Sequence, residues 1–217
     1  MTGKIGQTEK ILLDLVANAL FHAGKEIPDS VDWQAVYEES KRQTVTALAY
    51  QGAELAGKNP DRLCKEWKES VIAAFVHGIQ VAAEHHQVDE MMGNAGIPYV
   101  ILKGCASAFY YPDPSRRLMG DVDFLVKRSD LEQAGEILRQ EGFVPWEEEH
   151  ICHVVYRKDV THLEMHFEPS GMPHGEAGAL ARSYLQDVME KAEEVLFEGE
   201  KIRIPAPFHH GLILLLH

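Results

Sequence analysis

The spacing of apolar residues separates a helical first part of the chain from a second part in which strands and helices alternate. From residue 8 to about 92, apolar positions recur at helical spacing. Residues 8–24 place Ile11 and Leu15 on one stripe, and a long periodic stretch over residues 59–96 closes at a glycine. We therefore predict an all-helical N-terminal region over residues 1–96.

After Pro98 the pattern becomes that of short strands separated by turns and helices. A mixed sheet of about five strands flanked by helices follows from this alternation, so the fold class is α/β (α+β). We assign this core to residues 97–205 and the start of a C-terminal helix to residues 206–217. The expected strands are residues 98–104, 121–126, 143–148, 151–158 and 161–167, with a hairpin over 195–205, and the expected helices are residues 105–111, 129–143 and 178–195.

Composition limits the classes of partner. The 217 residues include 21 basic and 34 acidic side chains, which gives a net charge of −13 and argues against a general nucleic-acid binder. The three cysteines show no CxxC spacing, and the sequence shows neither a signal peptide nor an 18-residue apolar run. We therefore expect a cytoplasmic protein with no membrane partner, and we leave its oligomeric state open.

Two aspartates stand in the apolar segment "GDVDFLV". Because side chains alternate along a strand, Asp121 and Asp123 point to the same face, while Val122 and Phe124 point to the other. Like charges held together are costly to desolvate unless a cation lies between them, and a divalent metal is the usual cation for such a pair. The pair therefore predicts a metal site.

A possible phosphate site precedes these aspartates. Gly104 follows an apolar strand and begins a helix, and a glycine there lets the backbone approach a phosphate closely. Lys103 adds a positive charge beside it. If the aspartate strand lies alongside, groups for metal and for phosphate converge, as phosphoryl or nucleotidyl transfer requires.

The segment "LKGCASAFYYPDPSRRLMGDVDFLV" resembles the signature of the nucleotidyltransferase-fold superfamily that includes DNA polymerase β, and within it an uncharacterised bacterial nucleotidyltransferase family. The resemblance implies a nucleotidyltransferase-like sheet and a metal-dependent transfer of a nucleoside monophosphate from a nucleoside triphosphate, with release of pyrophosphate. It implies Mg²⁺ or Mn²⁺ held by Asp121, Asp123 and a third carboxylate, Glu164, from "THLEMHF". The acidic charge favours a small-molecule or protein acceptor.

The same resemblance assigns nucleotide binding to Lys103, Gly104 and Cys105, and the paired Arg116 and Arg117 are candidates for gripping phosphates. Pairing with nearby carboxylates is the alternative role for these arginines. Two features depart from the superfamily pattern. A cysteine replaces the usual serine after the glycine, and Asp121 follows Gly104 by 17 positions, a somewhat longer distance than is typical.

Two other functions remain open. His162, Glu164 and His166 share one strand face and, with His153, could bind zinc or another transition metal. A catalytically silent binding or regulatory protein of the same fold, such as an antitoxin-like partner, is also compatible with Cys105 and the apolar C-terminal helix.

Overall fold

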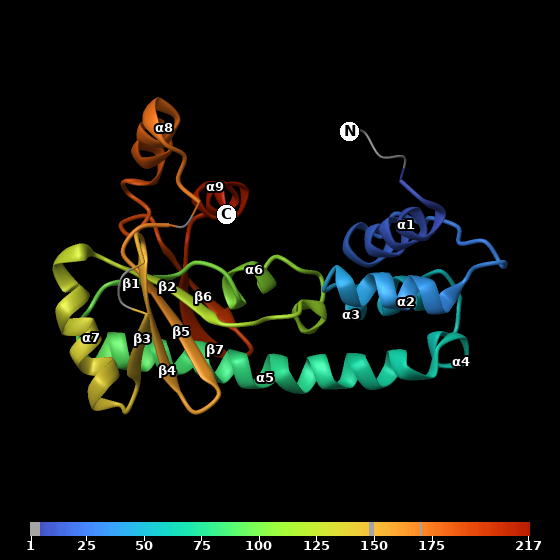
Figure 1. Cartoon of the computed structure of the whole chain (residues 1–217), viewed down its shortest axis with the longest axis horizontal. Coiled ribbons are helices and arrows are strands. Elements are labelled where there is room, and N and C mark those ends of the chain that lie inside the picture. The colour runs from blue at the N-terminus through green and yellow to red at the C-terminus, as the bar shows by residue number, and fades with distance from the viewer. Residues whose placement is uncertain (1–4, 148–149, 170) are drawn as a thin grey trace. The chain divides into compact units, whose positions relative to one another are not determined.

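The computed structural model describes residues 5–147, 150–169 and 171–217 (Figure 1). The chain forms two compact units, and each is described by itself. One extends to Ile79 and includes Tyr110–Leu118, and the other comprises Gln80–Phe109 and Met119–His217. The predicted boundary at residue 96 therefore falls inside the second unit, because the long helix α5 (Lys65–Asn94) contributes to both units.

The first unit is helical, as its apolar spacing predicts. Its aromatic core is centred on the fully buried Trp67, whose ring lies 6.2 Å from that of Trp33, 6.0 Å from that of Tyr37 and 6.1 Å from that of Tyr50. The Trp67 indole N–H donates to the Thr46 carbonyl at 3.0 Å, which satisfies the one polar atom of this side chain. The unit contains α1 (Gln7–Phe21), α2 (Trp33–Arg42), α3 (Thr46–Leu55), α4 (Pro60–Leu63), the first half of α5 and the short helix η1 (Pro114–Arg116).

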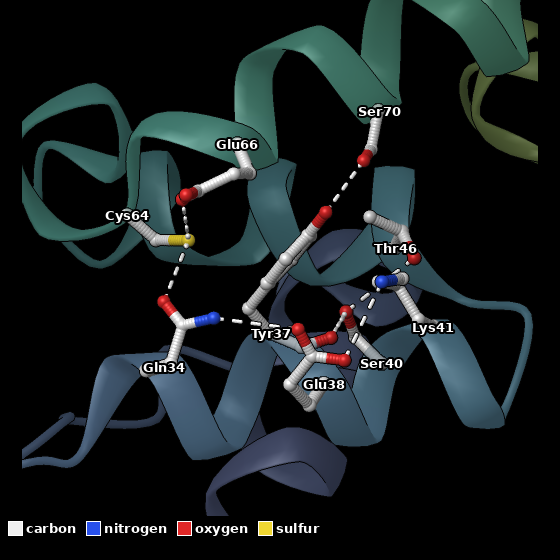
Figure 2. Close-up of polar contacts among 9 residues, drawn as sticks. All are labelled: Gln34, Tyr37, Glu38, Ser40, Lys41, Thr46, Cys64, Glu66 and Ser70. Carbon is white, nitrogen blue, oxygen red and sulfur yellow. Dashed lines mark hydrogen bonds and ion pairs between the residues drawn. The ribbon is translucent and has the colours of Figure 1, made fainter.

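Polar contacts join α2 to the start of α5 (Figure 2). The Tyr37 hydroxyl and Ser70 Oγ lie 2.7 Å apart, and the Cys64 thiol lies 3.4 Å from acceptor oxygens of both Gln34 and Glu66. Burial raises the pKa of the Cys64 thiol, so the neutral form that donates these bonds is favoured. These contacts fix the register of the two helices.

The second unit is built on a five-stranded mixed sheet, which confirms the predicted fold class. The strand order is β1-β2-β5-β4-β3; β2 and β5 are parallel, and the other neighbours are antiparallel. The strands are β1 (Tyr99–Ile101), β2 (Val122–Val126), β3 (Val144–Glu147), β4 (His153–Lys158) and β5 (Thr161–His166), and a separate hairpin is formed by β6 (Glu193–Phe197) and β7 (Glu200–Ile204). The helices are α6 (Cys105–Ala108), η2 (Arg128–Asp130), α7 (Leu131–Gln140), α8 (Gly175–Leu185) and α9 (Pro207–Leu216).

The two faces of the sheet differ in polarity. Val122 and Phe124 of β2 and Met165 of β5 are buried in one core with residues of α5 and α7. The alternate residues face the other way, where Leu125 packs with Ile213 of α9. Asp123 and Glu164 belong to this second face, because each directly precedes or follows a residue of the first core.

Two predicted helices are shorter than expected. The helix predicted over residues 178–195 ends at Leu185, because Glu193 and Glu194 pair with β7 in the hairpin and Val188 packs in the core beside Leu185. The helix predicted over residues 105–111 ends at Ala108. No helix in the part of the chain that the structure describes has the length and apolarity needed to cross a membrane.

The turn between β1 and α6 is held by a buried histidine. Gly104 has φ +52° and ψ −119°, a conformation that residues with a side chain rarely adopt. A Cβ atom at Gly104 would lie 2.3 Å from His85 Nε2. The His85 ring cannot easily yield, because it is completely buried and its Nδ1 lies 2.7 Å from the Val81 carbonyl.

We predict that Gly104→Ala lowers the free energy of unfolding more than Gly96→Ala does. Gly96 also has a positive φ, of 68°, but a Cβ there would meet nothing within 4 Å. Gly96→Ala should therefore cost only the backbone strain of about 1–2 kcal/mol, and Gly104→Ala about 1–3 kcal/mol more for the overlap with His85. Urea unfolding measures both, and equal costs would contradict the packing described here.

Candidate active site

The parallel pair of strands places two carboxylates side by side. In the register of β2 with β5, Asp123 lies opposite Glu164. The backbone of β1 holds the other side of β2, since Leu102 N–H donates to the Asp123 carbonyl at 2.8 Å. Lys103, which directly follows Leu102, is thereby brought next to the Asp123 side chain.

Asp123 is a buried carboxylate with two hydrogen-bond donors. Only 2% of the residue is exposed, and its Oδ1 accepts from Lys103 Nζ at 2.6 Å and from His166 Nε2 at 3.1 Å. Burial alone would raise the pKa of this carboxyl, but the hydrogen bond from His166 and the charge of Lys103 outweigh burial and lower the pKa. Asp123 is therefore ionised at neutral pH.

Glu164 shares the same histidine. Its Oε2 lies 3.3 Å from His166 Nε2 and 3.8 Å from His153 Nδ1. The hydrogen bond from His166 lowers the pKa of Glu164 despite partial burial and the charge of Asp123. In return, although burial acts to lower the pKa of His166, the bonds to the two carboxylates raise it. Because ionised carboxylates only accept hydrogen bonds, Nε2 of His166 carries the proton.

Asp121 completes the group of acidic residues. It lies at the entrance of β2 and is exposed, and its pKa is raised by desolvation and by the like charges of Asp123 and Glu164. This repulsion is the property that a divalent cation would relieve, and three carboxylates are oxygen ligands of the kind that Mg²⁺ and Mn²⁺ prefer. The predicted trio thus fits a hard metal ion in its chemistry.

The residues predicted to bind phosphate have other partners in this structure. Lys103 Nζ donates to His217 Nε2 at 2.8 Å as well as to Asp123. The Cys105 N–H points to His85 Nε2 at 3.4 Å, and the Cys105 side chain is buried against Met119. A phosphate contact from the Cys105 amide would therefore require this hydrogen bond to be replaced, and the role of these residues stays a prediction.

Arg116 and Arg117 belong to the first unit, whereas the acidic residues belong to the second. Arg116 Nε donates to Asp113 Oδ2 at 2.9 Å, and Arg117 Nη1 donates to the Leu118 carbonyl at 3.3 Å. The ion pair with Asp113 is the alternative role that the sequence suggested for these arginines. Their contribution to nucleotide binding stays a prediction.

Strand alternation alone does not show which histidines lie beside Glu164. Strand alternation does place His162, Glu164 and His166 on one face, but His162 is exposed. Within the described chain, His153 takes its place beside Glu164 and His166, with possible ligand atoms within 4.8 Å of one another. The signal lay in strand pairing, since His153 lies directly opposite His166 in the antiparallel register of β4 with β5.

Comparison with known proteins identifies the family. The family model described as "Uncharacterised nucleotidyltransferase" matches residues 29–217. A search of the curated proteins found no match. The family match covers most of the chain, including both strands that carry the acidic residues, and the chain therefore belongs to this family.

We predict that Lys103 and Asp123 are energetically coupled. Lys103→Met leaves a buried carboxylate with one cationic partner fewer, and Asp123→Asn removes the charge that Lys103 compensates. The double variant should lose less stability than the sum of the single variants, with a coupling on the order of 1–3 kcal/mol. Urea unfolding of the unmodified protein, the two single variants and the double variant, without divalent metal, measures this coupling. Additive effects would show that the ion pair contributes nothing to the free energy of unfolding.

We also predict a pH-dependent effect of His166. Because the folded-state pKa of His166 is raised, its contribution to stability is full below the unfolded value near 6.5 and is lost as pH rises through the folded pKa. His166→Gln should therefore cost more stability at pH 6 than at pH 9. Chemical unfolding at the two pH values, with His162→Gln as the exposed control on the same strand, tests this prediction. A larger loss at pH 9 would mean that the shift has the opposite sign.

Proposed function

We propose that this member of the uncharacterised nucleotidyltransferase family transfers a nucleoside monophosphate from a nucleoside triphosphate to an acceptor hydroxyl, with release of pyrophosphate. The observation that carries the proposal is the opposed position of Asp123 and Glu164 on two adjacent parallel strands, with the like charge of Asp121 at the entrance of β2. Their mutual repulsion has no structural benefit of its own, so it favours a site that uses the charge.

Asp121, Asp123 and Glu164 would hold Mg²⁺ or Mn²⁺. When bound, the metal supplies positive charge that stabilises the negative oxygens of the transferred phosphoryl group and of the leaving pyrophosphate. Hard cations of this kind take carboxylate oxygens in preference to imidazole nitrogens. We therefore assign His162 and His166 accessory roles, with His166 orienting both carboxylates through Nε2.

Lys103 and Glu164 have separate proposed roles. Lys103 combines a positive charge with 18% side-chain exposure, so phosphate oxygens can compete with Asp123 for its ammonium group. Glu164 is ionised at neutral pH because its pKa is lowered, and an ionised carboxylate can accept the proton of an acceptor hydroxyl. Gly104 and Cys105 are proposed to line the phosphate side of the site.

The acceptor is proposed to be a small molecule or a protein. A net charge of −13 disfavours a nucleic-acid acceptor, because each phosphate contact with RNA or DNA needs a cationic side chain. The nucleoside triphosphate is also anionic, but the metal ion that it carries would neutralise part of its negative charge.

A catalytically silent binding protein is the second candidate function. It is favoured by the contacts of Lys103 with Asp123 and of the Cys105 amide with His85, since both groups proposed to face phosphate already have partners. Metal-dependent nucleotide binding distinguishes the two functions, because a scaffold has no requirement for both ligands together.

We predict that Asp123→Asn and Glu164→Gln differ in nucleotide binding. Asp123 is proposed to hold the metal that carries the triphosphate, so Asp123→Asn should lose most of the magnesium-dependent affinity, at least about tenfold. Glu164 acts mainly on the acceptor side, an interaction that belongs to the transition state, so Glu164→Gln should keep the affinity within a small factor. Calorimetry with a non-hydrolysable nucleoside triphosphate, with and without Mg²⁺, measures both effects.

The control for this experiment is Asp130→Asn, a carboxylate of η2 at the far end of β2 from Asp121. It should bind as the unmodified protein does. Loss of binding in Glu164→Gln with intact binding in Asp123→Asn would reverse the assigned roles. Equal binding in all variants would place the metal site elsewhere.

A further inference from the structure

A second group of metal-ligating side chains lies at the start of β4. His150, Cys152 and His153 each offer one ligand atom, and these three atoms lie within 4.8 Å of one another. The group combines one thiol with two imidazoles, whereas the carboxylate trio contains only oxygen ligands. Thiol and imidazole ligands select transition metals such as zinc and cobalt rather than magnesium.

The distances in this group suit a tetrahedral ion. Cys152 Sγ lies 3.4 Å from His150 Nδ1 and 3.7 Å from His153 Nδ1. Zinc–sulfur and zinc–nitrogen bonds of ordinary length, at a tetrahedral angle, separate the two ligand atoms by roughly 3.6 Å. The observed separations lie on either side of this value, so Cys152 Sγ already lies at ligand spacing from both imidazole nitrogens.

The backbone holds two of the three ligands in place. The Cys152 carbonyl accepts hydrogen bonds from Phe167 N–H at 2.9 Å and Glu168 N–H at 3.3 Å, and His153 pairs with His166 across the sheet. His150 lies before the strand and is more exposed than Cys152 and His153. Its ring stacks on that of His153 with the centroids 3.8 Å apart and the planes 15° apart, so His150 must rotate to direct its nitrogen at a shared ion.

We propose that His150, Cys152 and His153 form a transition-metal site for a zinc-like divalent ion, with water in the fourth position. The site is distinct in its ligands from the proposed magnesium site, but the two are adjacent. His153 Nδ1 lies 3.8 Å from Glu164 Oε2, so metal binding at Nδ1 withdraws His153 from Glu164. The site does not depend on the proposed transferase function, because no nucleotide takes part in its formation.

Cobalt(II) is the probe that tests the site, since a cobalt–thiolate bond gives a charge-transfer absorption in the near ultraviolet. Reduced, metal-free protein titrated with cobalt should show this band with a stoichiometry of one ion per chain. Cys152→Ser should abolish the band, and His150→Ala should weaken cobalt affinity at least about tenfold. Cys64→Ser, which alters a buried cysteine of the first unit, is the control and should retain both band and affinity.

Circular dichroism establishes that each variant is folded, and His150→Ala carries the test if Cys152→Ser does not fold. Absence of the band in the unmodified protein, its persistence in Cys152→Ser, or unchanged cobalt affinity in His150→Ala would overturn the proposal. Loss of the band in Cys64→Ser would also overturn it. Failure of nucleotide binding with an intact cobalt band would reject the transferase function and leave this metal site standing.

Discussion

The parallel pairing of β2 with β5 is the constraint on which the candidate site depends. It sets Asp123 opposite Glu164, while Phe124 and Met165 lie on the other face, in one core with residues of α5 and α7. A shift of one residue in this register would move the acidic side chains into the apolar core. The packing of Phe124 and Met165 therefore fixes the position of the carboxylates without touching them.

The charges of Asp123 and Glu164 are partly compensated by neighbouring residues of the same unit. Asp123 receives hydrogen bonds from Lys103 and His166, and Glu164 receives one from His166. Breaking a buried pair of this kind costs much more than forming it gains, so the arrangement holds the site in one geometry. Asp121, which is exposed and has a raised pKa, is the least compensated of the three carboxylates.

The sequence predicted the parts of this site that depend on local pattern. The alternation in "DVDFLV" gives the face of Asp123, and the glycine after β1 gives the turn before α6. That Asp121 shares the face of Asp123 stays a prediction. The sequence pattern could not predict the hydrogen-bond partners of Lys103 and Cys105. The Cys105 amide turns toward His85, a residue of α5 that lies 20 positions earlier and whose ring is fixed by Val81.

The histidines also show that a local pattern does not predict contacts between distant residues. Alternation places His166 on the same face as Glu164, but its contact with Asp123 spans 43 residues and depends on the strand order. His162 has the same alternation and remains exposed, because it lies nearer the end of β5 that joins the turn from β4. A periodic pattern identifies the face of a strand, whereas pairing with β4 and β2 decides which residues on that face meet.

The central claim is that the acidic residues of β2 and β5 bind a divalent metal ion. The most direct test measures Mn²⁺ binding in the absence of nucleotide, and the loss of the free-ion signal in electron paramagnetic resonance reports that binding. Manganese prefers carboxylate oxygen, so it reports on the acidic trio rather than on the thiol-containing group. The unmodified protein should bind manganese. Binding should be at least about tenfold weaker after Asp123→Asn and tighter after Lys103→Met, which removes the competing ammonium group. Equal manganese affinity in all three proteins would contradict the central claim.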